Sequence, residues 1–100
     1  MSKVSDPQRA LIAATSVPSL PRHVKLRHDA ARNRWTILAP ERVLTPDAIA
    51  LDILRLCDGK RSVEEIADAL VDQYAAPKQR ILSDVTNLLQ DLADKGVITA

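Results

Sequence analysis

The sequence predicts an α+β domain, in which a small three-stranded antiparallel sheet is followed by a three-helix bundle. Two patterns lead to this prediction: apolar and polar residues alternate between residues 23 and 44, and apolar residues recur at helical spacing from residue 45 to residue 96. The composition agrees, because a chain of 100 residues with no Phe, one Trp and one Tyr must fill its core with Leu, Ile, Val and Ala. We expect one domain over residues 21–100, preceded by a flexible N-terminal tail at residues 1–20.

The three predicted strands are short and are joined by tight turns. Residues 23–28 and 34–39 each alternate in polarity, which is typical of half-buried strands, and residues 29–33 form the hairpin loop between them. Pro40 and Glu41 form the next turn, since proline cannot donate a ladder hydrogen bond and suits a strand end. A third strand at residues 42–44 completes the sheet and forms one of its edges.

The first predicted helix follows this sheet directly. It starts with Thr45 as N-cap and Pro46 in the first helical position, runs to about Asp58, and stops at Gly59. Its apolar residues cover most of its circumference, so we expect it to be the most buried helix.

Two amphipathic helices complete the domain. The second opens with a capping box formed by Ser62 and Glu65, and the third extends from about Pro77 to Gly96. With their short connections the three helices resemble a winged-helix module, with the sheet at its N-terminal end. The third helix carries a broad apolar stripe, which consists of Ile81, Leu82, Val85, Leu88, Leu89, Leu92 and Ala93.

Charge and composition exclude several classes of protein. The formal net charge is +1, which gives no overall preference for nucleic acid or for a membrane surface. Residues 22–42 hold six basic and two acidic residues, whereas residues 43–100 hold six basic and ten acidic residues. No segment has the length and apolarity of a secretory signal or a membrane span, and the single cysteine cannot form an internal disulfide. We therefore expect a cytoplasmic protein.

Catalytic and metal-binding constellations are missing from the sequence. His23 and His28 are five positions apart on one strand, so their side chains point to opposite faces and cannot share a metal. Cys57 lies in the most apolar helix with no base nearby in sequence, and we expect it to be a buried structural residue. Both glycines, Gly59 and Gly96, mark helix ends and not a phosphate loop. The sequence thus predicts a protein that is not an enzyme and uses no cofactor.

DNA binding is one function open to such a trio of helices. The third helix would then be a recognition helix and present Lys78, Gln79 and Arg80 to the major groove. Phosphate contact requires clustered positive charge, however, and the second and third helices are rich in acidic residues while the basic residues gather in the strands.

Peptide binding is the alternative that the patterns favour. An edge strand has unpaired N–H and C=O groups that can pair with another chain, and the third strand is predicted to lie beside the wide apolar stripe of the third helix. The competing interpretation of that stripe stays open, because Ile81, Val85, Leu88 and Leu92 would equally fill the core.

Three segments of the chain resemble the PqqD family. They are residues 21–44, with Arg34-Trp35-Thr36-Ile37-Leu38-Ala39-Pro40-Glu41-Arg42-Val43-Leu44; residues 53–66, with Leu56-Cys57-Asp58-Gly59; and residues 89–96. The resemblance covers roughly residues 20–98. It implies a three-strand, three-helix recognition domain that acts in pyrroloquinoline quinone (PQQ) biosynthesis. Such a domain binds the precursor peptide PqqA as an added strand and presents it to the radical S-adenosylmethionine enzyme PqqE.

These expectations give a specific hypothesis for the site. The precursor peptide would pair with the edge strand, place its apolar side chains against the third helix, and offer acidic side chains to two arginines. The predicted peptide-binding residues are Arg34, Arg42, Val43, Leu44, Ile81, Val85 and Leu88. An exposed edge can also pair with a second copy of the chain, so a homodimer is an open alternative.

Overall fold

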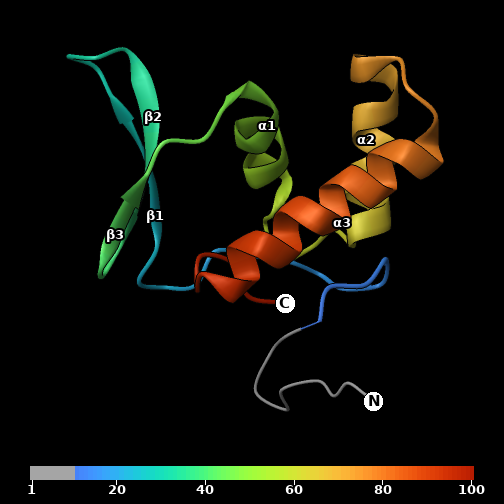
Figure 1. Cartoon of the computed structure of the whole chain (residues 1–100), viewed down its shortest axis with the longest axis horizontal. Helices are drawn as coiled ribbons and strands as arrows, with labels where there is room; N and C mark the ends of the chain where they lie inside the picture. The colour runs from blue at the N-terminus through green and yellow to red at the C-terminus, as the bar shows by residue number, and fades with distance from the viewer. Residues whose placement is uncertain (1–10) are drawn as a thin grey trace.

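The computed structural model describes residues 11–100 and confirms the α+β prediction of three antiparallel strands followed by three helices. Figure 1 shows the sheet standing beside the helices, with α3 running from α2 toward the sheet. The elements are β1 (Lys25–Asp29), β2 (Arg34–Ala39), β3 (Arg42–Leu44), α1 (Ala48–Leu56), α2 (Val63–Tyr74) and α3 (Lys78–Asp94).

The strands pair in chain order, β1–β2–β3, and the register fixes two different faces. Leu26 lies opposite Ile37, and Ile37 lies opposite Leu44, so these three side chains share one face. This inner face meets the helical core, because Ile37 is only 2% exposed and its two partners pack against buried residues. The outer face carries the opposed pair Leu38 and Val43, and Val43 is 65% exposed.

Helix α1 begins later than the sequence predicts. Its N-cap is Asp47 and not Thr45: the Asp47 backbone is extended, and its carboxylate accepts a hydrogen bond of 2.8 Å from the N–H of Ala50. Aspartate caps a helix at least as well as threonine does, so two starts were available and the folded chain uses the second. The prediction that this is the most buried helix is confirmed, because a smaller share of its residues is exposed than in α2 or α3, although Ile49 is 54% exposed.

The predicted start of α2 is confirmed. Ser62 and Glu65 form a reciprocal capping box, with hydrogen bonds of 3.1 Å and 2.8 Å. Helix α3 begins after Pro77 without any side-chain cap. Lys78 instead ties the start of α3 to α2, because its Nζ lies 3.1 Å from the Glu64 carboxylate and 3.0 Å from that of Asp68.

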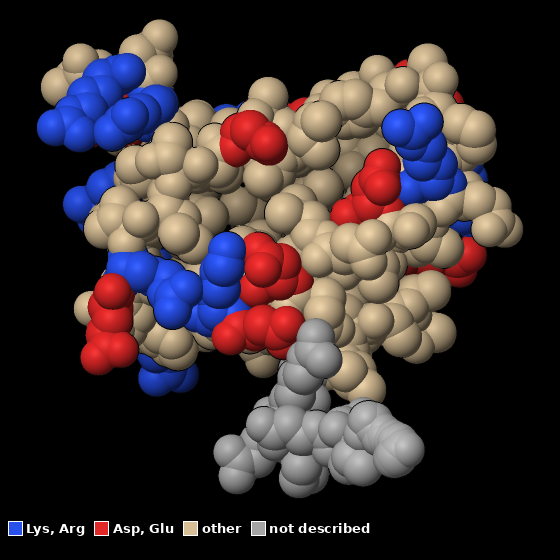
Figure 2. Space-filling model, in the orientation of Figure 1, with Lys and Arg blue, Asp and Glu red and all other residues tan. Residues whose placement is uncertain are grey.

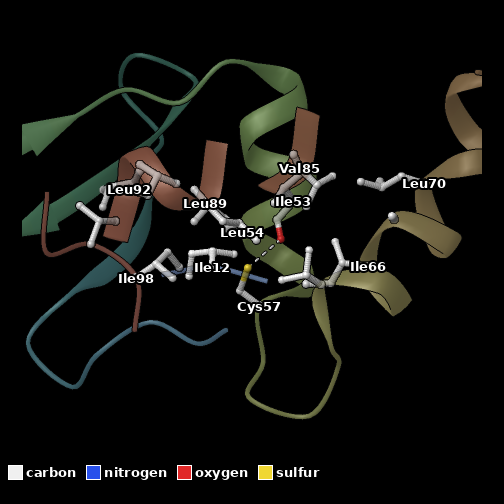
Figure 3. Close-up of a cluster of buried hydrophobic side chains, with 14 of the residues drawn as sticks. Ile12, Ile53, Leu54, Cys57, Ile66, Leu70, Val85, Leu89, Leu92 and Ile98 are labelled. Carbon is white, nitrogen blue, oxygen red and sulfur yellow. Dashed lines mark hydrogen bonds between the residues drawn. The ribbon is translucent and has the colours of Figure 1, made fainter. Parts of the chain in front are cut away.

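The core is entirely apolar among the described residues and lies between the three helices and the inner face of the sheet. Figure 3 shows part of this core, where Ile53, Leu54 and Cys57 of the α1 segment meet Val85 and Leu89 of α3. The Cys57 thiol donates a 3.2 Å hydrogen bond to the carbonyl of Ile53, so the prediction of a buried structural cysteine is confirmed.

Residues 11–20 pack against the helices. Ile12 is 8% exposed and belongs to the core, as Figure 3 shows. The backbones of Ser19 and Thr99 exchange two hydrogen bonds of 2.8 Å and 2.9 Å, and the carbonyl of Ser16 accepts one from the first N–H of α2. These contacts differ from the flexible tail expected for residues 1–20. Isolated apolar residues give no periodic signal, so their long-range partners were invisible in the sequence. Residues 1–10 lie outside the described residues.

Candidate functional site

A groove runs between β3 and the C-terminal half of α3. Leu44 and Pro46 come from the sheet side, and Leu88 and Leu92 come from α3. Its cavity volume is about 230 Å³, and most of its lining side chains are apolar, which suits the apolar side chains of a ligand. We call this cavity the β3–α3 groove. Its other lining residues are Ile37, Thr45, Asp47, Ala50, Leu54 and Lys95.

The strand beside this groove has an unoccupied edge. β3 pairs with β2 on one side, and no other strand of the described chain pairs with its second side. The two-residue turn between Ala39 and Arg42 is closed by that pair, and successive pairs of an antiparallel ladder alternate between hydrogen-bonded and non-hydrogen-bonded types. This alternation directs the N–H and C=O of Val43 away from β2. A chain that approached this edge would find a donor and an acceptor ready to pair.

The structure brings three of the predicted site residues together. Leu44 and Leu88 both line the β3–α3 groove, and Val43 offers its backbone at the adjacent edge. The side chain of Val43 points to the outer face of the sheet and therefore does not line the groove.

Two other predicted residues lie elsewhere. Ile81 is 7% exposed and Val85 is 2% exposed, and both belong to the core. They line a separate cavity of about 120 Å³ between α1, α2 and α3, together with residues such as Ile49 and Tyr74. The sequence placed them with Leu88 because all three belong to one stripe, but a stripe does not reveal which neighbour covers each of its ends.

The two predicted arginines point to opposite faces of the sheet. Arg42 lies opposite Ala39 and shares the inner face, whereas Arg34 lies opposite Asp29 at the far end of β2, on the outer face. Only Arg42 is therefore close to the β3–α3 groove. Figure 2 shows one group of basic side chains at the tip of the β1–β2 hairpin and another between the lower end of β3 and α3.

Several lining residues could not be predicted from the sequence. Thr45, Pro46 and Asp47 connect β3 to α1, and a connector has no periodicity from which a site could be inferred. Lys95 lies just after α3 and reaches the groove only because the end of that helix comes close to the sheet. No motif or periodicity in the sequence marks Lys95 as a lining residue.

The described residues offer little for catalysis. They contain no group of three His, Cys, Asp or Glu side chains that could hold a metal ion. Burial raises the pKa of the Cys57 thiol to about 12, so this thiol is a poor nucleophile. A hydrogen bond to Asp52 raises the pKa of Tyr74, which favours the neutral phenol. No helix in the described part of the chain is long and apolar enough to cross a membrane.

The helix that would serve as the recognition helix for DNA carries basic residues that lie next to carboxylates. Lys78 is occupied by Glu64 and Asp68, and hydrogen bonds to Asp68 and Glu64 raise its pKa. Arg80 lies 4.0 Å from the Asp84 carboxylate. Two of the three residues that would face DNA thus have acidic neighbours, which would repel phosphate.

Comparisons with known proteins agree on one family. Residues 34–98 match the family model described as coenzyme PQQ synthesis protein D (PqqD). A protein of Bradyrhizobium diazoefficiens named "PqqA binding protein" is 52% identical, over 96% of this chain and 93% of its own length. A protein of the same name from Rhodopseudomonas palustris strain BisB5 is 58% identical, over 88% of this chain and 86% of its own length.

Two solved structures share the fold. One is the solution structure of the PqqD part of Methylobacterium extorquens PqqCD, described as a functional stand-alone recognition element for ribosomally synthesised and post-translationally modified peptides. It is 39% identical, has a TM-score of 0.76, and the match covers 89% of this chain and 95% of that one. The other is the crystal structure of PqqD from Xanthomonas campestris, which is 40% identical with a TM-score of 0.52, over 84% of this chain and 93% of that one.

Proposed function

Because this chain belongs to the PqqD family, we propose that it binds the precursor peptide PqqA, without catalysing a reaction, and presents it to the radical S-adenosylmethionine enzyme PqqE. The names of its relatives support the binding role, since they describe binding of PqqA and no reaction. The observation that carries the proposal is the edge of β3, which pairs with no further strand of residues 11–100 and lies beside an apolar groove.

The peptide is proposed to add as a fourth strand at β3. Its backbone pairs with the outward N–H and C=O of Val43, and every second side chain points into the β3–α3 groove between Leu44 and Leu88. Main-chain hydrogen bonds then supply affinity, and the groove selects for apolar side chains. The site comprises Arg42, Val43, Leu44 and Leu88; Arg34, Ile81 and Val85, which lie elsewhere in the fold, are left out of it.

A titration tests this role. Purified protein is titrated with PqqA by calorimetry, with a DNA duplex as control, and we expect saturable one-to-one peptide binding with a Kd on the order of micromolar, or about −8 kcal/mol. Absence of peptide binding together with salt-sensitive DNA binding would reverse the proposal.

Presentation to PqqE requires a second measurement. Sedimentation of the protein with PqqA and PqqE should give a ternary complex in which the peptide remains bound. Sedimentation of the protein alone at rising concentration tests the competing use of the same edge, because a homodimer paired through β3 would dissociate when PqqA is added. The proposal places these events in the cytoplasm, which suits the free thiol of Cys57.

A further inference from the structure

A second cavity lies next to the β3–α3 groove and has a different character. Its volume is about 260 Å³, and three nitrogen-bearing side chains from separate parts of the chain line it: His23 before β1, Arg42 at the start of β3, and Lys95 after α3. We call it the basic cavity. Its other lining residues are Ala39, Pro40, Glu41 and Gly96.

The two cavities follow each other along β3. Lys95 lines both of them, Leu44 belongs to the groove, and Arg42 belongs to the basic cavity. Leu44 and Arg42 are two residues apart and lie on the same face of the sheet, so they are separated by about 7 Å along the strand. A strand paired with β3 has the same repeat. Successive inward side chains of the bound peptide would therefore meet first one cavity and then the other.

Within the basic cavity, Arg42 is the group that would attract an anion. Glu41 is the one carboxylate among its lining residues, and it lies in the exposed turn before β3. Lys95 is held by Asp91, whose carboxylate lies 2.9 Å from its Nζ. Arg42 has no carboxylate within 4.0 Å among the described residues, so its guanidinium keeps all its donors available for a ligand.

We propose that the basic cavity is a carboxylate subsite, in which Arg42 binds an acidic side chain of the peptide two positions from an apolar side chain held in the β3–α3 groove. This inference rests on the proposed function, and it adds a recognition rule to it: an apolar residue and an acidic residue at spacing i and i+2. Arg42 thereby fixes the register of the peptide, which an apolar groove and a uniform backbone edge leave free to slip.

The test is a double-mutant cycle between protein and peptide. Each acidic residue of PqqA is changed in turn to its amide, and Kd is measured with the wild type and with Arg42→Gln. Arg34→Gln is the matched control, because it removes the same charge from the outer face of the sheet. Both arginines are exposed, so both variants should fold, and circular dichroism and thermal melting verify this.

We expect one acidic residue of PqqA to stand out. Its amide should weaken binding to the wild type about fivefold, as an ion pair of about 1 kcal/mol implies, and should have no further effect on Arg42→Gln. With Arg34→Gln the same peptide change should still cost about fivefold. The residue two positions from this acid should be apolar, and its change to alanine should be non-additive with Leu88→Ala.

Two results would overturn the inference. One of them leaves the proposed function intact, and the other overturns the proposed function as well. If PqqA binds to the wild type but every acid-to-amide change is additive with Arg42→Gln, the carboxylate subsite is wrong and the proposed function stands. If PqqA does not bind to the wild type at all, the proposed function and the inference that rests on it fail together.

Discussion

Replacing Val43 by proline isolates the proposed main-chain pairing from every other contact. Proline removes one N–H donor at the centre of β3. The alternation of the β2–β3 ladder directs that donor away from β2, so no hydrogen bond within the sheet is lost. The side chain is 65% exposed on the outer face of the sheet, so its loss should change little by itself. We therefore expect the free energy of unfolding to fall by less than about 1 kcal/mol.

The effect on binding should be much larger. One backbone hydrogen bond contributes about 1 kcal/mol net, and the peptide carbonyl that loses its donor at the edge of an apolar groove adds a desolvation cost, for a total of about 1–3 kcal/mol. The Kd for PqqA should rise by about fivefold to 150-fold. Calorimetry at fixed salt measures the Kd, and thermal melting measures stability.

A matched variant makes the result specific. Val43→Thr has nearly the same shape and keeps the N–H, so it should bind PqqA like the wild type. If a folded Val43→Pro variant also binds like the wild type, the peptide does not use this donor, and the proposed strand addition at Val43 would be refuted.

Three further predictions separate groove, core and thiol. Leu88→Ala should weaken PqqA binding about tenfold in calorimetry, since Leu88 lines the groove and its truncation removes about 1.4 kcal/mol of apolar contact; unchanged affinity would place the peptide elsewhere. Val85→Ala should lower the free energy of unfolding by about 2 kcal/mol in urea titrations but leave the Kd of the folded protein unchanged, because Val85 is 2% exposed and lines another cavity. Cys57 should resist iodoacetamide at pH 8 until the protein is denatured, because a pKa of about 12 leaves about one thiol in 10⁴ ionised; rapid labelling seen by mass spectrometry would contradict its burial. The same raised pKa, compared with 9.0 for an exposed thiol, means that stability falls as the pH rises above 9, where only the unfolded state ionises, and Cys57→Ala should remove that part of the fall.

Local interactions explain which features could be predicted correctly from the sequence. The capping box of Ser62 and Glu65 joins residues three positions apart, so its two hydrogen bonds need no distant partner. The three strands follow from alternation and turn residues, and the two-residue turn before Arg42 sets the register of β3. The order of elements and the edge position of β3 therefore follow from the amino-acid sequence by itself.

Where the sequence offers two competing local signals, only the tertiary structure decided between them. Thr45 and Asp47 are both good N-caps, and the folded chain uses Asp47, whose carboxylate accepts a hydrogen bond from the first turn of α1. Residues 11–20 pack on the core although they have no periodic pattern. This packing could not be predicted, because their partners are more than forty positions away in the sequence.

Only the tertiary structure decided which residues make up the candidate site. Val85 and Leu88 belong to one stripe of α3, but α1 and α2 bury the former while the latter faces the groove beside β3. Arg34 and Arg42 belong to one basic region, but the pleat of the sheet separates them onto opposite faces. A periodic pattern shows which residues share a side of one element. Which element then covers that side depends on how segments distant in the sequence pack together, and that packing is decided only when the whole chain folds.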